Sequence, residues 1–216
     1  MSQQATLKLS VMGSSDVGKT TIMQRFTENS TNVQTPTIGV EYFAHLHNYE
    51  GQYSSLNNQS IKFSIWDLGG GERFKTITRS YLPATQGIIL VYDLNNYNSF
   101  CKLEEWLNTV RQYTRIEENI PGIVLANKRD LPDRKISKEE GQKWADEHGF
   151  LYAEVSAKND QFQVHQAISE FLNVMVNKYQ DQIPRERKKN SYYPRLLTNN
   201  NNRFRISFFK NYCCIL

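Results

Sequence analysis

One short run of the chain combines glycines, a lysine and a hydroxyl at a spacing suited to phosphate binding. The run lies between an apolar segment and a helix-compatible one and reads Gly13-Ser14-Ser15-Asp16-Val17-Gly18-Lys19-Thr20. Its pattern, G-x-x-x-x-G-K-[ST], lets backbone N–H groups face an anion, while the lysine adds charge and the last hydroxyl can ligate Mg²⁺. A glycine turn with a chance Lys-Thr pair is the alternative. The predicted phosphate contacts are Ser14, Ser15, Asp16, Val17, Gly18, Lys19, Thr20 and Thr21.

Two further runs carry groups that could recognise a guanine base. Asn127-Lys128-Arg129-Asp130 and Ser156-Ala157-Lys158 each follow an apolar strand pattern. A carboxylate at Asp130 can accept from the ring N–H and the exocyclic amine of guanine, a donor pair that adenine lacks, so an ATP-dependent kinase is disfavoured. An N-K-x-D run alone could be a solvated loop, but its position between the other two runs argues against chance. The predicted ligand is GTP or GDP, held by Asn127, Lys128, Asp130, Ser156, Ala157 and Lys158.

A metal site is predicted beside the phosphates, formed by Thr20, Thr37 and Asp67. The two hydroxyls would bind Mg²⁺ directly and the carboxylate would bind it through water. The backbone N–H groups of Thr37 and Gly70 are expected to contact a γ-phosphate, so the loops around them should order with GTP and relax with GDP. The groups predicted to act in hydrolysis are Lys19, Thr37 and Gly70.

Alternating strands and helices must position these groups. Apolar strand patterns cover residues 7–12, 61–67, 87–93, 122–127 and 151–155. Strands that alternate with helices predict a mainly parallel sheet covered on both faces, and such sheets bind ligands at the carboxyl ends of their strands. Ser137 and Glu140 are spaced as a capping box that opens a helix. The last helix carries an apolar stripe that we expect in the core, formed by Phe162, Ile168, Phe171, Leu172, Met175 and Val176.

With these motifs in place, the sequence resembles the Ras superfamily of small GTPases, and within it the Rab branch. The Rab-like stretches are residues 38–42, 65–67, 72–78 and 90–94. The resemblance covers residues 5–180 and implies an α/β P-loop NTPase fold, the small GTPase G domain, with a mainly parallel six-stranded sheet flanked by helices. It also implies a monomeric enzyme that hydrolyses GTP to GDP with Mg²⁺, and that meets effectors, an exchange factor and a GTPase-activating protein.

Three aromatic residues match a surface that is characteristic of this branch. Tyr42, Trp66 and Tyr81 fall where Rab proteins carry an aromatic triad that effectors read. Ordinary packing is the alternative for each of them.

The residue after Gly70 departs from the family pattern. Relatives usually carry Thr-Ala before this glycine and Gln after it, whereas this chain has Leu68-Gly69 and Gly71. That glutamine orients the attacking water, and hydrolysis is slow even when it is present, about 3–5 × 10⁻⁴ s⁻¹ for Ras alone. We therefore predict very slow turnover. Two alternatives stay open: an activating protein that supplies its own glutamine, and a constitutively GTP-loaded scaffold that does not cycle.

Asp16 is a second departure, because relatives usually have a small neutral residue there. Like charges about 8 Å apart at an effective dielectric of about 20–40 repel by about 1–2 kcal/mol, so the carboxylate could weaken nucleotide binding roughly tenfold and speed release. The alternative is that Asp16 pairs with Lys128 and leaves exchange unchanged.

Residues 45–60 form a third departure, because they exceed the usual tight turn between the two strands. They predict an extended β-hairpin with a polar tip. Alternation on one strand face accounts for His45 and His47, and no further ligands cluster nearby, so no metal site is predicted there.

Charge is unevenly distributed along the chain. It carries 26 basic and 22 acidic residues in total, but residues 185–216 hold eight of the basic residues and one of the acidic ones. The rest of the chain is therefore mildly acidic, which argues against nucleic acid as a partner. A basic segment of this kind suits an anionic membrane surface. We expect residues 181–216 to form a disordered, hypervariable tail.

The tail ends in Cys213-Cys214-Ile215-Leu216, a pattern that resembles a Rab tail prenylated on Cys213 and Cys214. A disulfide is the weaker alternative. Neither a signal peptide nor an apolar run near 18 residues is found, and Ser2 excludes N-myristoylation. The resemblance implies a prenyl-binding chaperone and a location on the cytoplasmic face of an intracellular membrane, in exchange with the cytosol. We interpret the chain as a Rab-like switch whose GTP form recruits effectors in vesicle traffic.

Overall fold

The structure is a computed structural model of the 216-residue chain, and it describes residues 6–28, 30, 37–51, 56, 59–71, 79–114 and 120–183. Several sequence predictions fall outside these residues. They concern the Rab-like stretch 72–78, the basic tail beyond residue 183, and the lipidation sites Cys213 and Cys214.

Six strands form one sheet in the order β2-β3-β1-β4-β5-β6. β2 pairs antiparallel with β3, and all other neighbours pair parallel, so the predicted mainly parallel six-stranded sheet is confirmed. β4 and β5 are buried along their whole length, as expected for central strands covered on both faces. The strands are β1 (Thr6–Met12), β2 (Val40–Asn48), β3 (Ser60–Leu68), β4 (Gly87–Asp93), β5 (Gly122–Asn127) and β6 (Leu151–Glu154).

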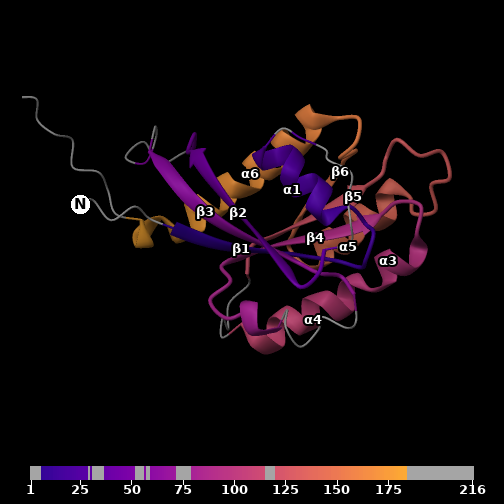
Figure 1. Cartoon of the computed structure of the whole chain (residues 1–216), viewed down its shortest axis with the longest axis horizontal. Helices are drawn as coiled ribbons and strands as arrows, with labels where there is room; N and C mark the ends of the chain where they lie inside the picture. Colours follow the sequence, from indigo (N-terminus) through magenta and orange to yellow (C-terminus); the bar gives the residue numbers. More distant parts are fainter. Residues whose placement is uncertain are drawn as a thin grey trace, which may run out of the picture. The chain divides into compact units, whose positions relative to one another are not determined.

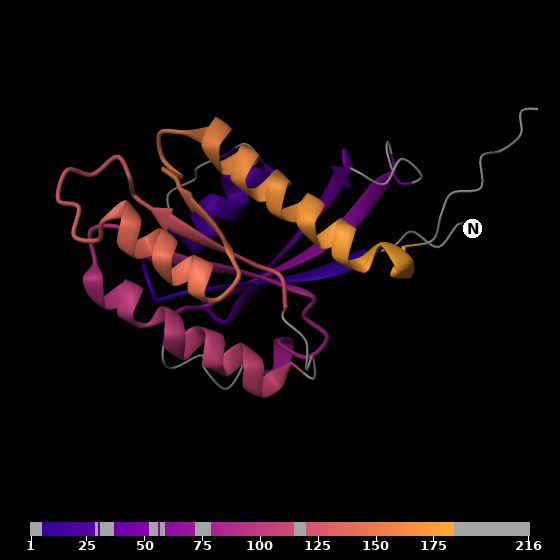
Figure 2. The ribbon, with the colours of Figure 1, turned by 180° about the vertical axis from the view of Figure 1, so that it is seen from behind.

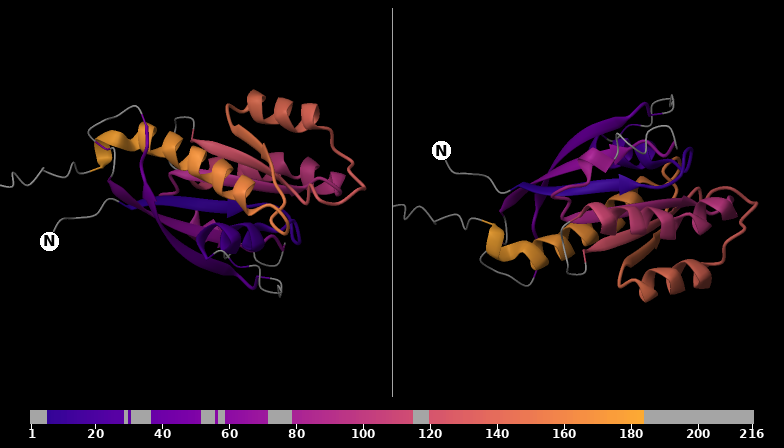
Figure 3. Two further views of the ribbon diagram at one scale, coloured as in Figure 1. Left: turned by 90° about the horizontal axis from the view of Figure 1, so that it is seen from above. Right: turned by 90° about the horizontal axis from the view of Figure 1, so that it is seen from below.

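Helices cover the sheet on both faces (Figure 1). α1 (Lys19–Thr27) and α6 (Gln161–Tyr179) lie together on one face, where the short 3₁₀ helix η2 (Gln180–Gln182) continues α6 (Figure 2). α3 (Tyr97–Cys101), α4 (Leu103–Tyr113) and α5 (Lys138–Glu147) lie on the opposite face. Figure 3 looks onto the two faces of the sheet: α6 lies in front of it in the view from above, and α4 lies in front of it in the view from below. Each face buries its own apolar cluster, which fixes the sheet as the rigid frame of the site.

Side chains cap the N-termini of two helices, and the cap of α5 is the capping box that the sequence predicts. Ser137 caps α5, since its hydroxyl accepts from the Glu140 N–H at 3.1 Å while the Glu140 carboxylate accepts from the Ser137 N–H at 2.8 Å. Asp160 caps α6 by accepting from the Gln163 N–H at 3.0 Å. These caps fix where the loops before α5 and α6 end, and those loops carry the predicted base-binding residues.

The apolar stripe of α6 is confirmed except at its first member. Five of the six predicted residues are buried, but Phe162 is 76% exposed. Helical geometry explains the error, because Phe162 lies two positions before the buried Val164, or about 200° around the helix from it. The buried residues of α6 are Val164, Ala167, Ile168, Phe171, Leu172, Met175, Val176 and Tyr179.

The hairpin between β2 and β3 is long, as predicted, with the strands paired from Val40↔Leu68 to Asn48↔Ser60. Its tip, however, is not wholly polar. Tyr49 and Leu56 are buried in the cluster beneath α6, and the Tyr49 hydroxyl donates to the Asn177 side chain. The sequence pattern did not predict this contact, because a partner 128 positions away leaves no local signal.

Candidate functional site

The loop between β1 and α1 has the curled backbone that the sequence predicts for phosphate binding. Gly18 adopts φ 91°, and a Cβ there would lie 2.3 Å from the Asn127 Nδ2, so no larger residue fits. Lys19 begins α1 and is buried, with its Nζ donating to the Ser14 carbonyl at 2.9 Å. Burial lowers the Lys19 pKa, while the nearby Asp67 and Asp16 carboxylates act in the opposite direction. The ammonium is thus held at the mouth of a helix N-terminus, where anions are favoured.

The three predicted metal ligands meet beside Lys19. The Thr20 hydroxyl lies 2.7 Å from the Thr37 hydroxyl and also donates to Asp67 Oδ2. Asp67 is fully buried, and burial raises its pKa to about 6 against the lowering effects of Lys19 and Thr20. Its second oxygen, Oδ1, has no hydrogen-bond partner among the described residues. Two hydroxyls and a buried carboxylate with a spare oxygen fit Mg²⁺, which prefers oxygen ligands.

Asn127 ties the two predicted ligand loops together. Its buried side chain donates to the Val17 carbonyl at 2.8 Å and accepts from the Ala157 N–H at 3.1 Å. Asp130, three residues further on, accepts from the Ser156 hydroxyl at 2.6 Å. Hydrogen bonds therefore connect the phosphate loop, the end of β5 and the loop after β6 in one network.

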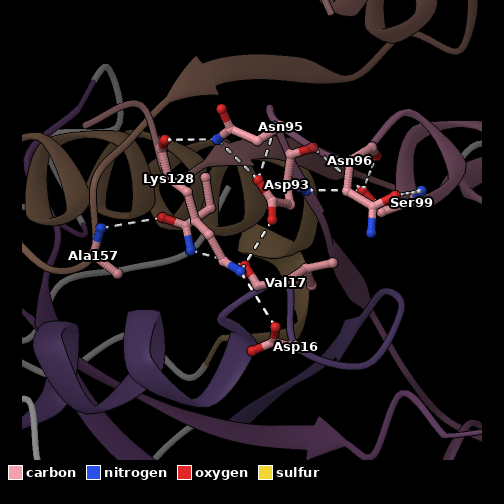
Figure 4. A network of polar contacts seen from close by, with 9 residues as sticks. Asp16, Val17, Asp93, Asn95, Asn96, Ser99, Lys128 and Ala157 are labelled. Carbon is pink, nitrogen blue, oxygen red and sulfur yellow. Dashed lines mark hydrogen bonds and ion pairs between the residues drawn. The ribbon is translucent and has the colours of Figure 1, made fainter. Parts of the chain in front are cut away.

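Lys128 lies between two carboxylates (Figure 4). Its Nζ is 3.0 Å from Asp93 Oδ2 and 3.6 Å from Asp16 Oδ2. The pairing of Asp16 with Lys128, one of the two alternatives for Asp16, is therefore present in the structure. Asp93 is in turn held by Asn95, whose backbone N–H donates to it at 2.8 Å.

Gly70 packs directly on the phosphate loop. A Cβ at this position would lie 2.4 Å from the backbone carbon of Ser14 and 2.5 Å from the Gly13 oxygen, so the chain must have glycine here. Gly70 and Gly71 also line a pocket of about 280 Å³ between the phosphate loop and the helices α3 and α4. Because both are glycines, this wall of the pocket contains backbone only, with no side chain to orient water.

The remaining predicted residues lie at the rim of the site. Ser15 and Lys158 are exposed, and Thr21 is half-buried in the first turn of α1.

Two residues that the sequence did not predict also contribute to the site. Arg25 of α1 donates to the Ala157 carbonyl at 3.0 Å and to the Lys158 carbonyl at 2.8 Å, and Asp93 holds Lys128. The place of Asp93 at the carboxyl end of β4 was a usable signal, whereas the contacts of Arg25 span over 130 positions and left none.

The predicted aromatic triad is contiguous. The Tyr42 and Trp66 ring centroids are 5.0 Å apart, as are those of Trp66 and Tyr81, and Tyr42 is 46% exposed. The three rings thus form a partly exposed aromatic surface.

His45 and His47 have packing partners. The His45 ring lies against Phe26, while the His47 Nε2 lies 2.8 Å from the Asn173 side-chain oxygen. Burial lowers the pKa of His45 to about 4. Within the part of the chain that the structure describes, no group of three His, Cys, Asp or Glu residues could hold a metal ion.

A phosphate loop, a Thr-Thr-Asp cluster and an Asp-bearing base loop, all at the carboxyl ends of a mainly parallel sheet, define a P-loop protein that binds guanine nucleotide. The chain matches the Ras family over residues 8–177 and belongs to it. It is a small GTPase of the Rab kind, an enzyme class that hydrolyses GTP to GDP and works in membrane traffic.

The similar proteins carry Rab names. The chain is 39% identical over 156 residues to Ras-related protein Rab-18 of Lymnaea stagnalis, covering 72% of this chain and 73% of the relative. It is 38% identical to Rab-18 of Caenorhabditis briggsae over 154 residues, with 71% and 72% covered. Rab-10 of Caenorhabditis elegans is 39% identical over 153 residues, with 70% and 72% covered. Among the described helices, none is both long and apolar enough to span a membrane.

Proposed function

We propose that the chain is a Rab-type switch that binds GTP or GDP with Mg²⁺ and, in its GTP form, recruits effectors to an intracellular membrane. One observation carries the proposal. The Thr20 and Thr37 hydroxyls and the Asp67 carboxylate meet at the start of α1, next to the buried Lys19. This set of oxygens beside a phosphate loop suits a cation shared with phosphate oxygens.

Base selection is assigned to the loops after β5 and β6. Asp130 would accept from guanine, and its hydrogen bond from Ser156 supports a fixed orientation of the carboxylate. Asn127, held by Val17 and Ala157, would keep the base loop against the phosphate loop. The full set of proposed base contacts is Asn127, Lys128, Asp130, Ser156, Ala157 and Lys158.

Hydrolysis is assigned to water attacking the γ-phosphate in line with the leaving oxygen. Lys19 would stabilise the charge that develops on the phosphate oxygens, and the backbone N–H groups of Thr37 and Gly70 would hold the γ-phosphate. Mg²⁺, when bound, would neutralise charge between the β- and γ-phosphates. These groups would hold the phosphate, but none of them would orient the attacking water.

The absence of a side chain at Gly71 makes intrinsic hydrolysis slow. In the family the glutamine at this position positions the attacking water. Here Gly69, Gly70 and Gly71 present backbone only, and ordering three glycines around a γ-phosphate costs more backbone entropy than ordering the usual residues. The GTP form should therefore persist longer than in relatives that carry the glutamine.

Partners and membrane attachment follow from other parts of the chain. We assign effector binding to the Tyr42, Trp66 and Tyr81 surface, next to the loops that would respond to GTP. We assign residues 5–180 to the G domain and residues 181–216 to a basic tail prenylated on Cys213 and Cys214. Two lipid chains, or one chain with basic residues, give durable anchoring. An exchange factor, an activating protein and a prenyl-binding chaperone complete the proposed set of partners.

Single-turnover hydrolysis of preloaded GTP with Mg²⁺ tests the proposal. Native protein should hydrolyse GTP more slowly than about 10⁻⁴ s⁻¹, and Gly71→Gln should accelerate it by about tenfold or more, because the carboxamide orients water. Gly71→Leu is the matched control: it adds a side chain of similar size that cannot hydrogen-bond, so it should not accelerate hydrolysis. Equal rates for native protein and Gly71→Gln would contradict the assignment.

The same assay separates the switch from a second candidate, a constitutively GTP-loaded scaffold, which the bare backbone at Gly71 favours. Cell extract, as a source of activating protein, is added to native protein. Strong acceleration identifies a cycling switch. If extract has no effect while Gly71→Gln restores turnover, the chain functions as the scaffold.

A further inference from the structure

Two loops that face each other across the nucleotide site are joined at their outer edge by one ion pair. Asp16 lies on the crest of the phosphate loop, and Lys128 lies on the loop after β5. Both adopt positive φ, 62° and 63°, a region that residues other than glycine rarely occupy. Figure 4 shows the two side chains pointing toward each other from these two loops.

A buried carboxylate holds the Lys128 side chain in place. The Lys128 Nζ lies 3.0 Å from Asp93 Oδ2, and Asp93 is buried at the end of β4. Asn95 fixes this carboxylate by donating from its backbone N–H, and its side chain donates to the Lys128 carbonyl at 3.2 Å. The ammonium is therefore a fixed point of the frame, and Asp16 is the movable partner, with a side chain 98% exposed.

We propose that Asp16 and Lys128 form a clasp that holds the phosphate loop to the base loop and slows nucleotide release. The inference rests on the proposed nucleotide site, since a nucleotide bound there contacts both loops and leaves when they separate. An inner link between the loops is already present in the hydrogen bond from Asn127 to the Val17 carbonyl. The clasp adds an outer link one residue away on each side.

The distances from Asp16 to Lys128 and to the phosphates decide whether Asp16 slows or speeds nucleotide release. Its carboxylate also repels bound phosphates, which would speed release. At equal dielectric, a charge pair at the observed 3.6 Å interacts about twice as strongly as one at about 8 Å. Bound Mg²⁺ and the Lys19 ammonium would offset most of the charge of the phosphates, so the attraction between Asp16 and Lys128 exceeds the repulsion that remains. Asp16 therefore acts as a positioning residue that keeps the nucleotide bound. An exposed ion pair contributes modestly, so removing it should change release by about two- to fivefold.

Release of a fluorescent GDP analogue from the full chain tests the clasp. Asp16→Asn removes the charge while keeping the size and the tolerance for positive φ. We expect it to speed release by about two- to fivefold. The matched control is Asp133→Asn, the same charge change at an exposed aspartate outside the ion pair, which should leave release unchanged.

The salt dependence of nucleotide release distinguishes the loss of an ion pair from a structural defect. Between about 0.1 M and about 1 M salt the Debye length falls from about 10 Å to about 3 Å, so the difference between native protein and Asp16→Asn should shrink. Slower or unchanged release from Asp16→Asn would overturn the clasp while leaving the nucleotide site intact. Failure of the native chain to take up the analogue would overturn that site and the clasp with it.

Discussion

At the scale of single residues, Asp130 shows how local hydrogen bonds orient one carboxylate at the proposed base site. Its Oδ1 accepts from the Ser156 hydroxyl at 2.6 Å, and the same hydroxyl accepts from the Asn159 N–H at 3.0 Å. Because the hydroxyl uses both its donor and its acceptor capacity, it holds the carboxylate in one orientation. A preorganised acceptor loses less entropy when guanine arrives.

Asp130→Asn should lower the preference for GTP over ATP by at least about a hundredfold, because an amide presents a donor where the guanine amine needs an acceptor. Competition binding with both nucleotides measures this ratio. The control Ser156→Ala removes the orienting hydroxyl alone; it should weaken guanine binding while the preference for guanine persists. An unchanged ratio in Asp130→Asn would refute base selection by this carboxylate.

At the scale of elements, α6 supplies the cover for one face of the sheet. Its buried stripe packs in the same cluster as β1, β3 and the tip of the β2–β3 hairpin. Two phenylalanines of this helix have opposite environments: Phe171 is fully buried, and Phe162 is largely exposed. These two residues allow a core position and a surface position of the same residue type to be compared within one helix.

Phe171→Ala should destabilise the protein by about 3–5 kcal/mol, since it removes a buried ring and leaves a cavity. Phe162→Ala, the same change on the exposed side of α6, should alter stability by less than about 0.5 kcal/mol. Urea unfolding of both variants measures the difference. A similar loss in the two variants would mean that the stripe of α6 is misplaced.

At the scale of the whole molecule, the site is assembled from four distant parts of the chain. The phosphate loop follows β1, Asp67 lies near the end of β3, and the base loops follow β5 and β6. A ligand that contacts all four stabilises the folded state by binding it and not the unfolded chain.

GDP with Mg²⁺ at about 100 times its dissociation constant should add about 2.7 kcal/mol of stability and raise the unfolding midpoint by about 5–10 °C. Removing Mg²⁺ with a chelator should reduce this shift, because the Thr20, Thr37 and Asp67 oxygens then lose the cation they share with the phosphates. Thermal unfolding with GDP, with ADP and with GDP plus chelator measures both effects. An equal shift with ADP would argue against guanine selection.

Local sequence patterns predicted the fold well, and they selected residues that the structure brings together at one edge of the sheet. Lys19, Thr20 and Asp67 belong to short motifs, and the strand pattern alone placed those motifs at one edge of the sheet. Prediction failed where a contact joined distant segments or where burial depended on the position of a residue around its helix. Phe162 shares the apolar character of its helix but not its buried side, and no local pattern marks the contacts of Arg25 with the loop at Ala157.

The position of α6 also sets an order of events during synthesis. This helix is the last long element of the described chain, yet it covers strands made near the beginning and buries Tyr49 of the hairpin. Until the ribosome has released residues up to about 183, the apolar face of β1 and β3 has no complete cover. Sheet pairings between distant strands form slowly, and an uncovered apolar sheet is prone to aggregate. The nascent chain therefore needs protection from the first strand until its last helix has docked.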